Sequence, residues 1–213
     1  NLWKTCTDIA SEQVLRFDKN DNFWEMGEVG PCGPCSELHI DLGHGTCPLS
    51  DKHVCAVNLE GCWRFVELWN LVFMQYQRFA DGHLEELSAQ HVDTGMGLER
   101  ICRVLQEADS NYSTDLFVPI MDKISKVTGQ SDTGKESGVA FRVIADHLRS
   151  LSFAVADGAL PSNEGRGYVL RRMLRRATRF GRVLNMHEPF IYKLVPTLAE
   201  VMGDAFPEIN KQQ

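Results

Sequence analysis

Several common features are missing from this sequence, and each absence narrows the class of protein. No apolar run approaches the roughly 20 residues of a membrane-spanning helix, so no membrane partner is expected. The first ten residues have neither a basic start nor a long apolar stretch, and they therefore predict no secretion signal. There is no internal repeat and no low-complexity tract. The chain begins with Asn1 instead of Met, which predicts that Asn1 is not the natural start.

Positive charge is scarce overall but concentrated in one segment. The whole chain carries a net charge of −7, which alone argues against a nucleic acid partner. Between Arg142 and Arg182, however, nine arginines and no lysine stand against three acidic residues. The local balance is +6, and the rest of the chain carries −13. This asymmetry predicts a polyanionic partner for the basic segment.

Paired cysteine motifs are also scarce, although seven cysteines are present. An odd number without a secretion signal predicts reduced thiols. Cys32 and Cys35 form one Cys-x2-Cys pair, half of a common zinc site, but no second pair follows. The other potential ligands nearby are scattered: His39, His44, Cys47, His53, Cys55 and Cys62. Cys32 and Cys35 are therefore either zinc ligands or, the interpretation we favour, small apolar fillers of a turn fixed by glycine and proline.

The two halves of the chain differ in composition and periodicity. Residues 1–19 predict a helix leading into a strand, and residues 22–100 are rich in glycine, proline and cysteine with short β-prone runs. Apolar residues at helical spacing predict three later helices, at 115–127, 140–156 and 166–184. Turn residues predict loops at 129–138 and 157–165. The expected fold class is α+β, an antiparallel sheet with flanking helices followed by an all-helical domain, with domains at 1–130 and 131–213.

Two strand-like segments carry features suited to a ligand. In residues 65–76, Asn70 interrupts an apolar run, and a buried Asn needs partners for its amide. Asn70 therefore faces either a ligand or a local partner in the sheet, and the residues alone favour neither. Residues 92–101 predict a strand, a glycine-rich turn and a helix, where Gly95 and Gly97 let a flat ligand approach the backbone. This turn is neither the dinucleotide fingerprint nor a P-loop.

Charged and aromatic side chains accompany these segments. Asp93 can accept hydrogen bonds from an ammonium group, and Arg100 can reach a phosphate or lie along a base. The Gly–Pro–Cys segment, residues 22–37, precedes them. Its glycines and prolines predict a tight, preset backbone. There Trp24 offers a flat apolar wall, and Glu25 and Glu37 offer acceptors for a cation or a ribose hydroxyl.

The segment 166–184 separates into two faces when it is wound at about 100° per residue. Apolar residues from Leu170 to Leu184 gather on one face, and six arginines gather on the other: Arg171, Arg172, Arg175, Arg176, Arg179 and Arg182. These arginines predict either an RNA phosphate backbone as partner or a solvated face paired with acids from elsewhere in the chain. From the residues alone, the two interpretations are equally supported.

Five long segments, in this order, resemble the alanyl-tRNA synthetases, a subgroup of the class II aminoacyl-tRNA synthetases. They read NFWEMGEVGPCGPCSE, VELWNLVFMQYQRFADG, HVDTGMGLERI, FRVIADHLRSLSFAVADG and PSNEGRGYVLRRMLRRA. The resemblance extends from about Phe17 to Phe206. It implies part of a cytoplasmic ligase that activates alanine with ATP, accompanied by Mg²⁺, and transfers it to tRNA(Ala).

The resemblance assigns residues of the first half to alanine and ATP. The segment DTGMGLER resembles motif 3 of class II enzymes, which implies an ATP site at Gly95, Gly97 and Arg100. The implied contacts to alanine or its adenylate are Trp24, Asn70, Val72, Asp93 and Gly95. Among them Asp93 would hold the ammonium group, and Trp24 would wall a pocket small enough for a methyl side chain.

In the second half, the resemblance implies binding of the tRNA acceptor stem. The implied tRNA contacts are Asn163, Arg166, Arg171, Arg172, Arg175, Arg176 and Arg179. Asn163 would read the minor groove near the G·U pair that marks alanine tRNA, because an amide can both donate and accept. The residues alone support a helix N-cap for Asn163 equally well.

Two motifs of the family are not visible in this chain. They are motifs 1 and 2, and motif 2 carries the arginine that binds the α-phosphate. Because removing such a preorganised charge costs orders of magnitude in rate, we expect the isolated chain to be inactive, to contain no catalytic residue and to need the remaining parts of the same synthetase. The Cys- and His-bearing stretch 43–64 has no assigned role. Two alternatives remain: a noncatalytic RNA-binding paralogue and a zinc-stabilised structural module.

Overall fold

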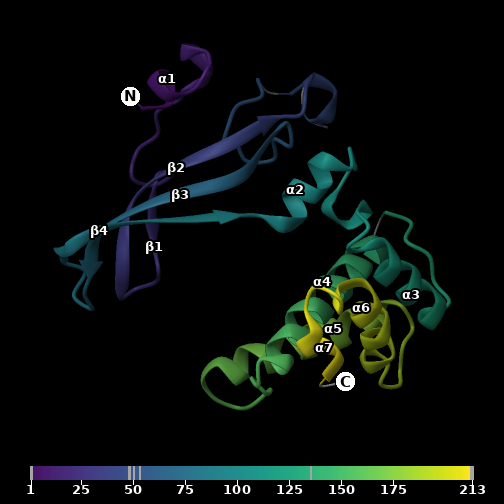
Figure 1. The fold of residues 1–213 in the computed structure, drawn as a ribbon. Helices are drawn as coiled ribbons and strands as arrows, with labels where there is room; N and C mark the ends of the chain where they lie inside the picture. The colour runs from purple at the N-terminus through teal and green to yellow at the C-terminus, as the bar shows by residue number, and fades with distance from the viewer. Residues whose placement is uncertain (1, 48, 50, 53, 135, 212–213) are drawn as a thin grey trace. The chain divides into compact units, whose positions relative to one another are not determined.

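The structure is a computed structural model that describes residues 2–47, 49, 51–52, 54–134 and 136–211. The chain divides into two compact units, Asn1–Ile101 and Cys102–Gln213 (Figure 1). This division precedes the predicted boundary at residue 130, because the helix at 118–128 packs with the helices that follow it. The prediction of domains 1–130 and 131–213 concerns a longer protein and stays a prediction.

A four-stranded antiparallel sheet forms the first unit, in the order β1-β2-β3-β4. Its strands are β1 (Phe23–Glu25), β2 (Gly30–Asp41), β3 (Phe65–Arg78) and β4 (Leu84–Met96). The strand predicted at 65–76 is confirmed, and its aromatic and β-branched residues suit a half-buried sheet. A tight turn joins β3 to β4, where Gly82 has a φ of 87° and donates its N–H to the carbonyl of Phe79 at 2.8 Å. The predicted α+β class is therefore confirmed.

The Gly–Pro–Cys segment, residues 22–37, contains β1, a bend at 26–29 and the start of β2. The turn predicted around Cys32 and Cys35 is wrong, because both lie in β2, with a shift of the β2–β3 register between them. Proline cannot donate to a ladder, and Pro34 lies where the pairing of β2 with β3 is interrupted, opposite Phe23 of β1. Gly33 permits the close approach of β3, since a Cβ at this position would lie 2.0 Å from the carbonyl oxygen of Phe73. The glycines and prolines thus specify an irregular strand.

The N-terminal segment contains helix α1 (Leu2–Cys6) and the 3₁₀ turn η1 (Ser11–Gln13). The strand predicted before residue 19 does not form in the described residues, because Leu15 and Phe17 instead line a cavity of about 660 Å³. Trp3 attaches this segment to β2, since its Nε1 donates to Ser36 Oγ at 2.7 Å. The segment is therefore attached to the sheet without extending it.

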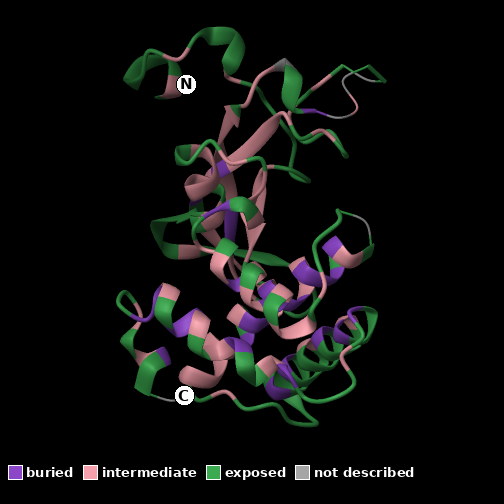
Figure 2. Cartoon of the chain, turned by 90° about the vertical axis from the view of Figure 1, so that its right-hand side faces the viewer, coloured by how far each residue is buried: buried purple, intermediate pink, exposed green. Residues whose placement is uncertain are grey.

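Helices make up the second unit, and the three predicted ones are confirmed. After α2 (Leu98–Leu105), the elements are η3 (Asn111–Ser113), α3 (Val118–Thr128), α4 (Glu136–Ala156), α5 (Gly165–Val183), η4 (Ile191–Leu194), α6 (Val195–Met202) and α7 (Pro207–Lys211). Figure 2 shows the buried residues gathered among these helices, whereas the sheet is mostly intermediate or exposed. The fully buried Ile120, Phe141 and Leu198 belong to this core. Within the described residues, no helix combines the length and apolar character needed to cross a membrane.

Gly181 lets helix α5 pass close to the ring of Phe190. A Cβ at Gly181 would lie 2.3 Å from Cε1 of Phe190, whose side chain is buried. Alanine is the better helix former by about 1 kcal/mol, but overpacking a core costs about 1–3 kcal/mol. We therefore expect Gly181→Ala to lower the free energy of unfolding, measured by urea denaturation. The exposed Arg179→Ala should change it by less than about 0.5 kcal/mol, and a Gly181→Ala variant as stable as the parent would contradict the packing argument.

Candidate functional site

The sheet register brings four of the predicted substrate residues together. Two neighbouring rows run across β2, β3 and β4: Glu37–Asn70–Gly95 and Cys35–Val72–Asp93. Residues directly opposite one another in antiparallel strands point to the same face, with Cβ atoms about 4.5–5.5 Å apart. Asn70, Val72 and Asp93 therefore share one face, beside the backbone of Gly95. We call these two rows the row site.

A buried polar group at the row site lacks a partner. The Asn70 amide nitrogen lies 3.4 Å from Glu37 Oε1, while its amide oxygen is buried without a hydrogen bond from any described residue. Leaving such an acceptor unpaired costs about 1–3 kcal/mol. A local partner thus accounts for only half of the Asn70 side chain, which leaves an acceptor for a ligand N–H.

Carboxylates surround this acceptor. Glu37 Oε2 lies 2.9 Å from His39 Nε2, and both side chains are largely buried. Asp93 is exposed, and its Oδ1 accepts the N–H of Thr94 at 2.8 Å. Two carboxylates and an unpaired amide oxygen on one face make an environment suited to a small cationic donor such as an ammonium group.

The strand, turn and helix predicted at residues 92–101 are confirmed. β4 ends at Met96, Gly97 donates its N–H to the carbonyl of Leu68 at 3.1 Å, and α2 begins at Leu98. A Cβ added at Gly95 would meet nothing within 4 Å, so packing does not require glycine there. The backbone at Gly95 is therefore exposed on this side of β4.

Arg100 has a carboxylate partner that the sequence did not reveal. Its Nη1 donates to Glu67 Oε2 at 2.7 Å and to the Glu67 carbonyl oxygen at 3.0 Å. These bonds hold the guanidinium beside β3, although Arg100 is 45% exposed. No sequence signal pairs the two, because they lie 33 positions apart and meet only through the strand pairing.

Trp24 lies on β1, the strand next to the β2 residues of the row site. It is half-buried in β1 opposite Gly33, and β2 separates β1 from β3. Its neighbour Glu25 forms an ion pair with Arg78, so this carboxylate already has a cationic partner. The 660 Å³ cavity adjoins the row site at Glu37, but its lining includes neither Trp24 nor Asn70.

The arginine face of α5 is exposed along its whole length, and so are the arginines among the predicted tRNA contacts: Arg166, Arg171, Arg172, Arg175, Arg176 and Arg179. Among the described residues, none of these arginines forms an ion pair with a carboxylate. Leu170 and Ala177 are buried on the opposite side of the helix. The pairing with acids from elsewhere in the chain is therefore not observed within the described residues.

Asn163 is not the N-cap of α5. Glu164 occupies that position, without a side-chain capping bond. The side-chain oxygen of Asn163 instead accepts a hydrogen bond from Arg171. The loop lies close against the helix, since a Cβ at Gly167 would come within 2.5 Å of the carbonyl oxygen of Leu160. Asn163 is thus exposed at the start of the arginine face.

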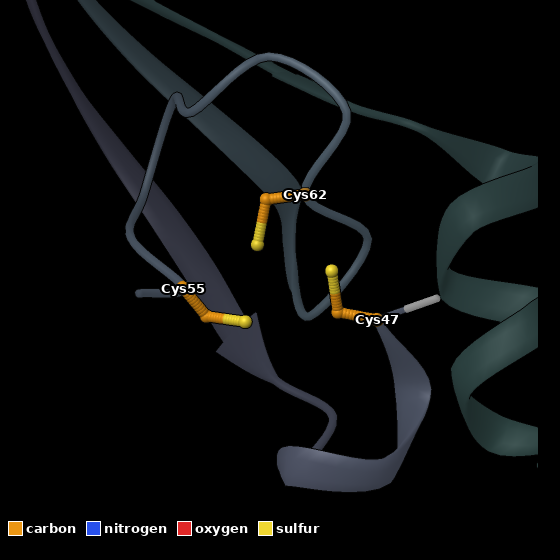
Figure 3. Close-up of side chains that lie close together, drawn as sticks. All are labelled: Cys47, Cys55 and Cys62. Carbon is orange, nitrogen blue, oxygen red and sulfur yellow. The ribbon is translucent and has the colours of Figure 1, made fainter. Parts of the chain in front are cut away.

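Three cysteines outside the predicted pair form a cluster between β2 and β3. The sulfur atoms of Cys47, Cys55 and Cys62 lie within 4.8 Å of one another and point toward a common centre (Figure 3). Burial and hydrogen bonds with the other two thiols raise the pKa of Cys55 to about 11. No regular spacing announced this cluster, because seven residues separate the first two cysteines and six the last two.

The predicted zinc candidates Cys32 and Cys35 do not belong to this group. Burial, followed by the charge of Glu25, raises the pKa of the Cys32 thiol. Burial, followed by the charge of Glu37, raises the pKa of Cys35. His53, another of the scattered ligands, lies outside the described residues.

The chain is similar to known proteins over its whole length. The family model described as "tRNA synthetases class II (A)" matches residues 1–213. A relative named alanine–tRNA ligase from Chlorobium phaeobacteroides is 57% identical over 218 residues, which cover 100% of this chain and 24% of the relative. Relatives with the same name from Chlorobaculum tepidum and Christiangramia forsetii are 56% and 52% identical, with the same coverage. The chain spans about a quarter of the length of these curated relatives.

Proposed function

Because the chain belongs to the family of class II (A) tRNA synthetases, we propose that it is part of an alanine–tRNA ligase. The full-length protein would join the alanine carboxylate to the α-phosphate of ATP, giving alanyl-adenylate and pyrophosphate, and would then transfer alanine to the 3′ end of tRNA(Ala), releasing AMP. The observation that carries this proposal is the row site, where an unpaired amide oxygen and an accessible carboxylate share one face.

The row site would bind the amino acid. The ammonium group would donate to the Asn70 amide oxygen and to Asp93, which satisfies the buried acceptor. Val72, only 7% exposed, and the aromatic Trp24 would limit the space for the side chain. Since one methylene contributes only about 1–3 kcal/mol, such a pocket favours alanine over glycine without excluding it.

The turn after the row site would bind ATP. Gly95 and Gly97 would let the nucleotide approach the backbone, and Arg100 would lie against it. Glu67 would orient the Arg100 guanidinium, so it is a positioning residue in this proposal. Mg²⁺ would accompany the phosphates, and carboxylate oxygens such as those of Glu67 are the ligands it prefers.

The exposed arginine face of α5 would bind the acceptor stem of tRNA(Ala). Its arginines have no carboxylate partner among the described residues, so they are available to phosphates. Asn163 would contribute an amide to the RNA minor groove. These contacts would hold the RNA while the 3′ end receives alanine.

Other parts of the longer protein would complete the site. β4 lies at the edge of the sheet, and 12 of its 13 residues are exposed, including Val92 at 66%. Proteins usually protect an exposed edge strand of this length from pairing with other chains. We propose that another segment of the same synthetase packs against β4. That segment would also bring the arginine for the α-phosphate, and the protein would work in the cytoplasm.

Pyrophosphate exchange tests the proposed function. The full-length protein should catalyse alanine-dependent exchange between pyrophosphate and ATP, and should prefer alanine to glycine by roughly 10- to 200-fold in kcat/KM. The 213-residue chain alone should give no exchange. If the full-length protein bound tRNA(Ala) but gave no exchange with any amino acid, the noncatalytic RNA-binding alternative would replace this proposal.

A further inference from the structure

The cysteine cluster lies in a long connection between two strands of the row site. The connection from Leu42 to Arg64 contains only the short 3₁₀ turn η2 (His44–Thr46) among its described residues. Loops longer than about 12–15 residues without secondary structure are uncommon and need their own means of ordering. The ordered conformation of this loop therefore requires stabilising contacts.

Apolar packing does not stabilise this loop. Val54 is 89% exposed and Trp63 is 59% exposed, so large apolar side chains of the loop face solvent. Cys47 is nevertheless only 3% exposed. The loop thus buries Cys47 while Val54 and Trp63 remain exposed, so its large apolar side chains do not form a core of their own.

The geometry of the three sulfur atoms suits one tetrahedral ion. Zinc–sulfur bonds of about 2.3 Å at tetrahedral angles separate the sulfur atoms by about 3.8 Å. The observed sulfur atoms all lie within 4.8 Å of one another and point toward a common centre (Figure 3). Side-chain rotations that close the cluster by about 1 Å would be sufficient for coordination.

The number of thiols favours a metal over a disulfide. One disulfide would use two of the three thiols, whereas one ion uses all three. Among divalent ions, thiolate ligands select zinc.

We propose that Cys47, Cys55 and Cys62 bind one structural Zn²⁺ ion, with a further ligand at the fourth corner. The ion would close the loop and so fix the ends of β2 and β3, the strands that carry Glu37 and Asn70. This site is separate from the row site and from the Cys32/Cys35 pair. It does not depend on the proposed ligase activity.

Zinc content per chain tests the proposal. The full-length protein and its Cys47→Ser/Cys55→Ser/Cys62→Ser variant would be purified from zinc-supplemented cells and measured by plasma mass spectrometry. The variant should hold one zinc fewer per chain than the parent. The matched control Cys6→Ser, at an exposed cysteine of α1, should hold as much as the parent. Equal zinc in parent and triple variant would overturn the proposal, as would loss of zinc with Cys35→Ser but not with the triple variant.

Cobalt substitution keeps the test decisive if the triple variant does not fold. Cys55→His replaces one thiolate by another metal ligand, so the variant should still bind Co²⁺ at this site. Its thiolate-to-cobalt charge-transfer band should lose about a third of its intensity, since one of three thiolates is gone. An unchanged cobalt spectrum, or a disulfide joining two of these cysteines in the native protein, would refute the site.

Discussion

Replacing Asp93 by asparagine in the full-length protein should cut kcat/KM for alanine by roughly 10- to 150-fold. Asp93 is exposed on the face that it shares with Val72 and Asn70, so its charge is available to an ammonium group. Hydrogen bonds to charged groups contribute about 1.5–3 kcal/mol, and about 1.4 kcal/mol corresponds to a factor of ten. The loss should appear in pyrophosphate exchange as a higher KM for alanine.

Glu86→Gln is the matched control for Asp93→Asn. Glu86 is an exposed acid on the same strand, but it lies opposite Tyr76 and outside the row site. The same loss of charge there should leave kcat/KM for alanine within about twofold of the parent, because distant surface charges are screened by salt. The KM for ATP should be unaffected in both variants. An unchanged KM for alanine in Asp93→Asn would refute the proposed role of Asp93.

Local patterns predicted the elements that carry the proposed site, but not their pairing. The apolar run around Asn70 and the glycine-rich turn at Gly97 each specified their own backbone. That Asn70 lies opposite Gly95 depends on the β3–β4 register, which is set by packing across the sheet. The Glu67–Arg100 bond follows from the same register. The sequence was therefore sufficient to predict which residues belong to the proposed site. Their contact partners could be identified only from the fold.

The sequence-based predictions that were wrong, and the cysteine cluster that they missed, have similar physical explanations. Glycine and proline in the first half of β2 predicted a turn, but a strand tolerates them where its ladder is interrupted. Asn163 was a plausible N-cap, yet the helix begins one residue later, after Glu164. Cysteines at irregular spacing could not be grouped in advance, because the loop's path alone brings Cys47 beside Cys62. In each case a non-local contact decided between locally acceptable conformations.

The second large effect is expected on the arginine face of α5. Arg175→Glu combined with Arg179→Glu reverses two charges at i and i+4, which lie on the same exposed side of the helix. If each arginine contributes one charge-assisted bond to phosphate, worth about 1.5 kcal/mol, the pair should weaken tRNA(Ala) binding by roughly 100-fold at low salt. The slope of log K against log salt should also fall by about 1.4–1.8, since two phosphate contacts release fewer counterions.

A control with the same change in net charge separates local contact from general repulsion. Lys126→Glu combined with Lys211→Glu reverses two exposed charges on α3 and α7, away from the arginine face. Because it removes no phosphate contact, this pair should leave the salt slope unchanged and weaken binding only slightly. Fluorescence anisotropy with tRNA(Ala) over a salt series distinguishes the two variants. If both pairs weakened binding equally, the total charge of the protein would explain the effect and the arginine face would lose its proposed role.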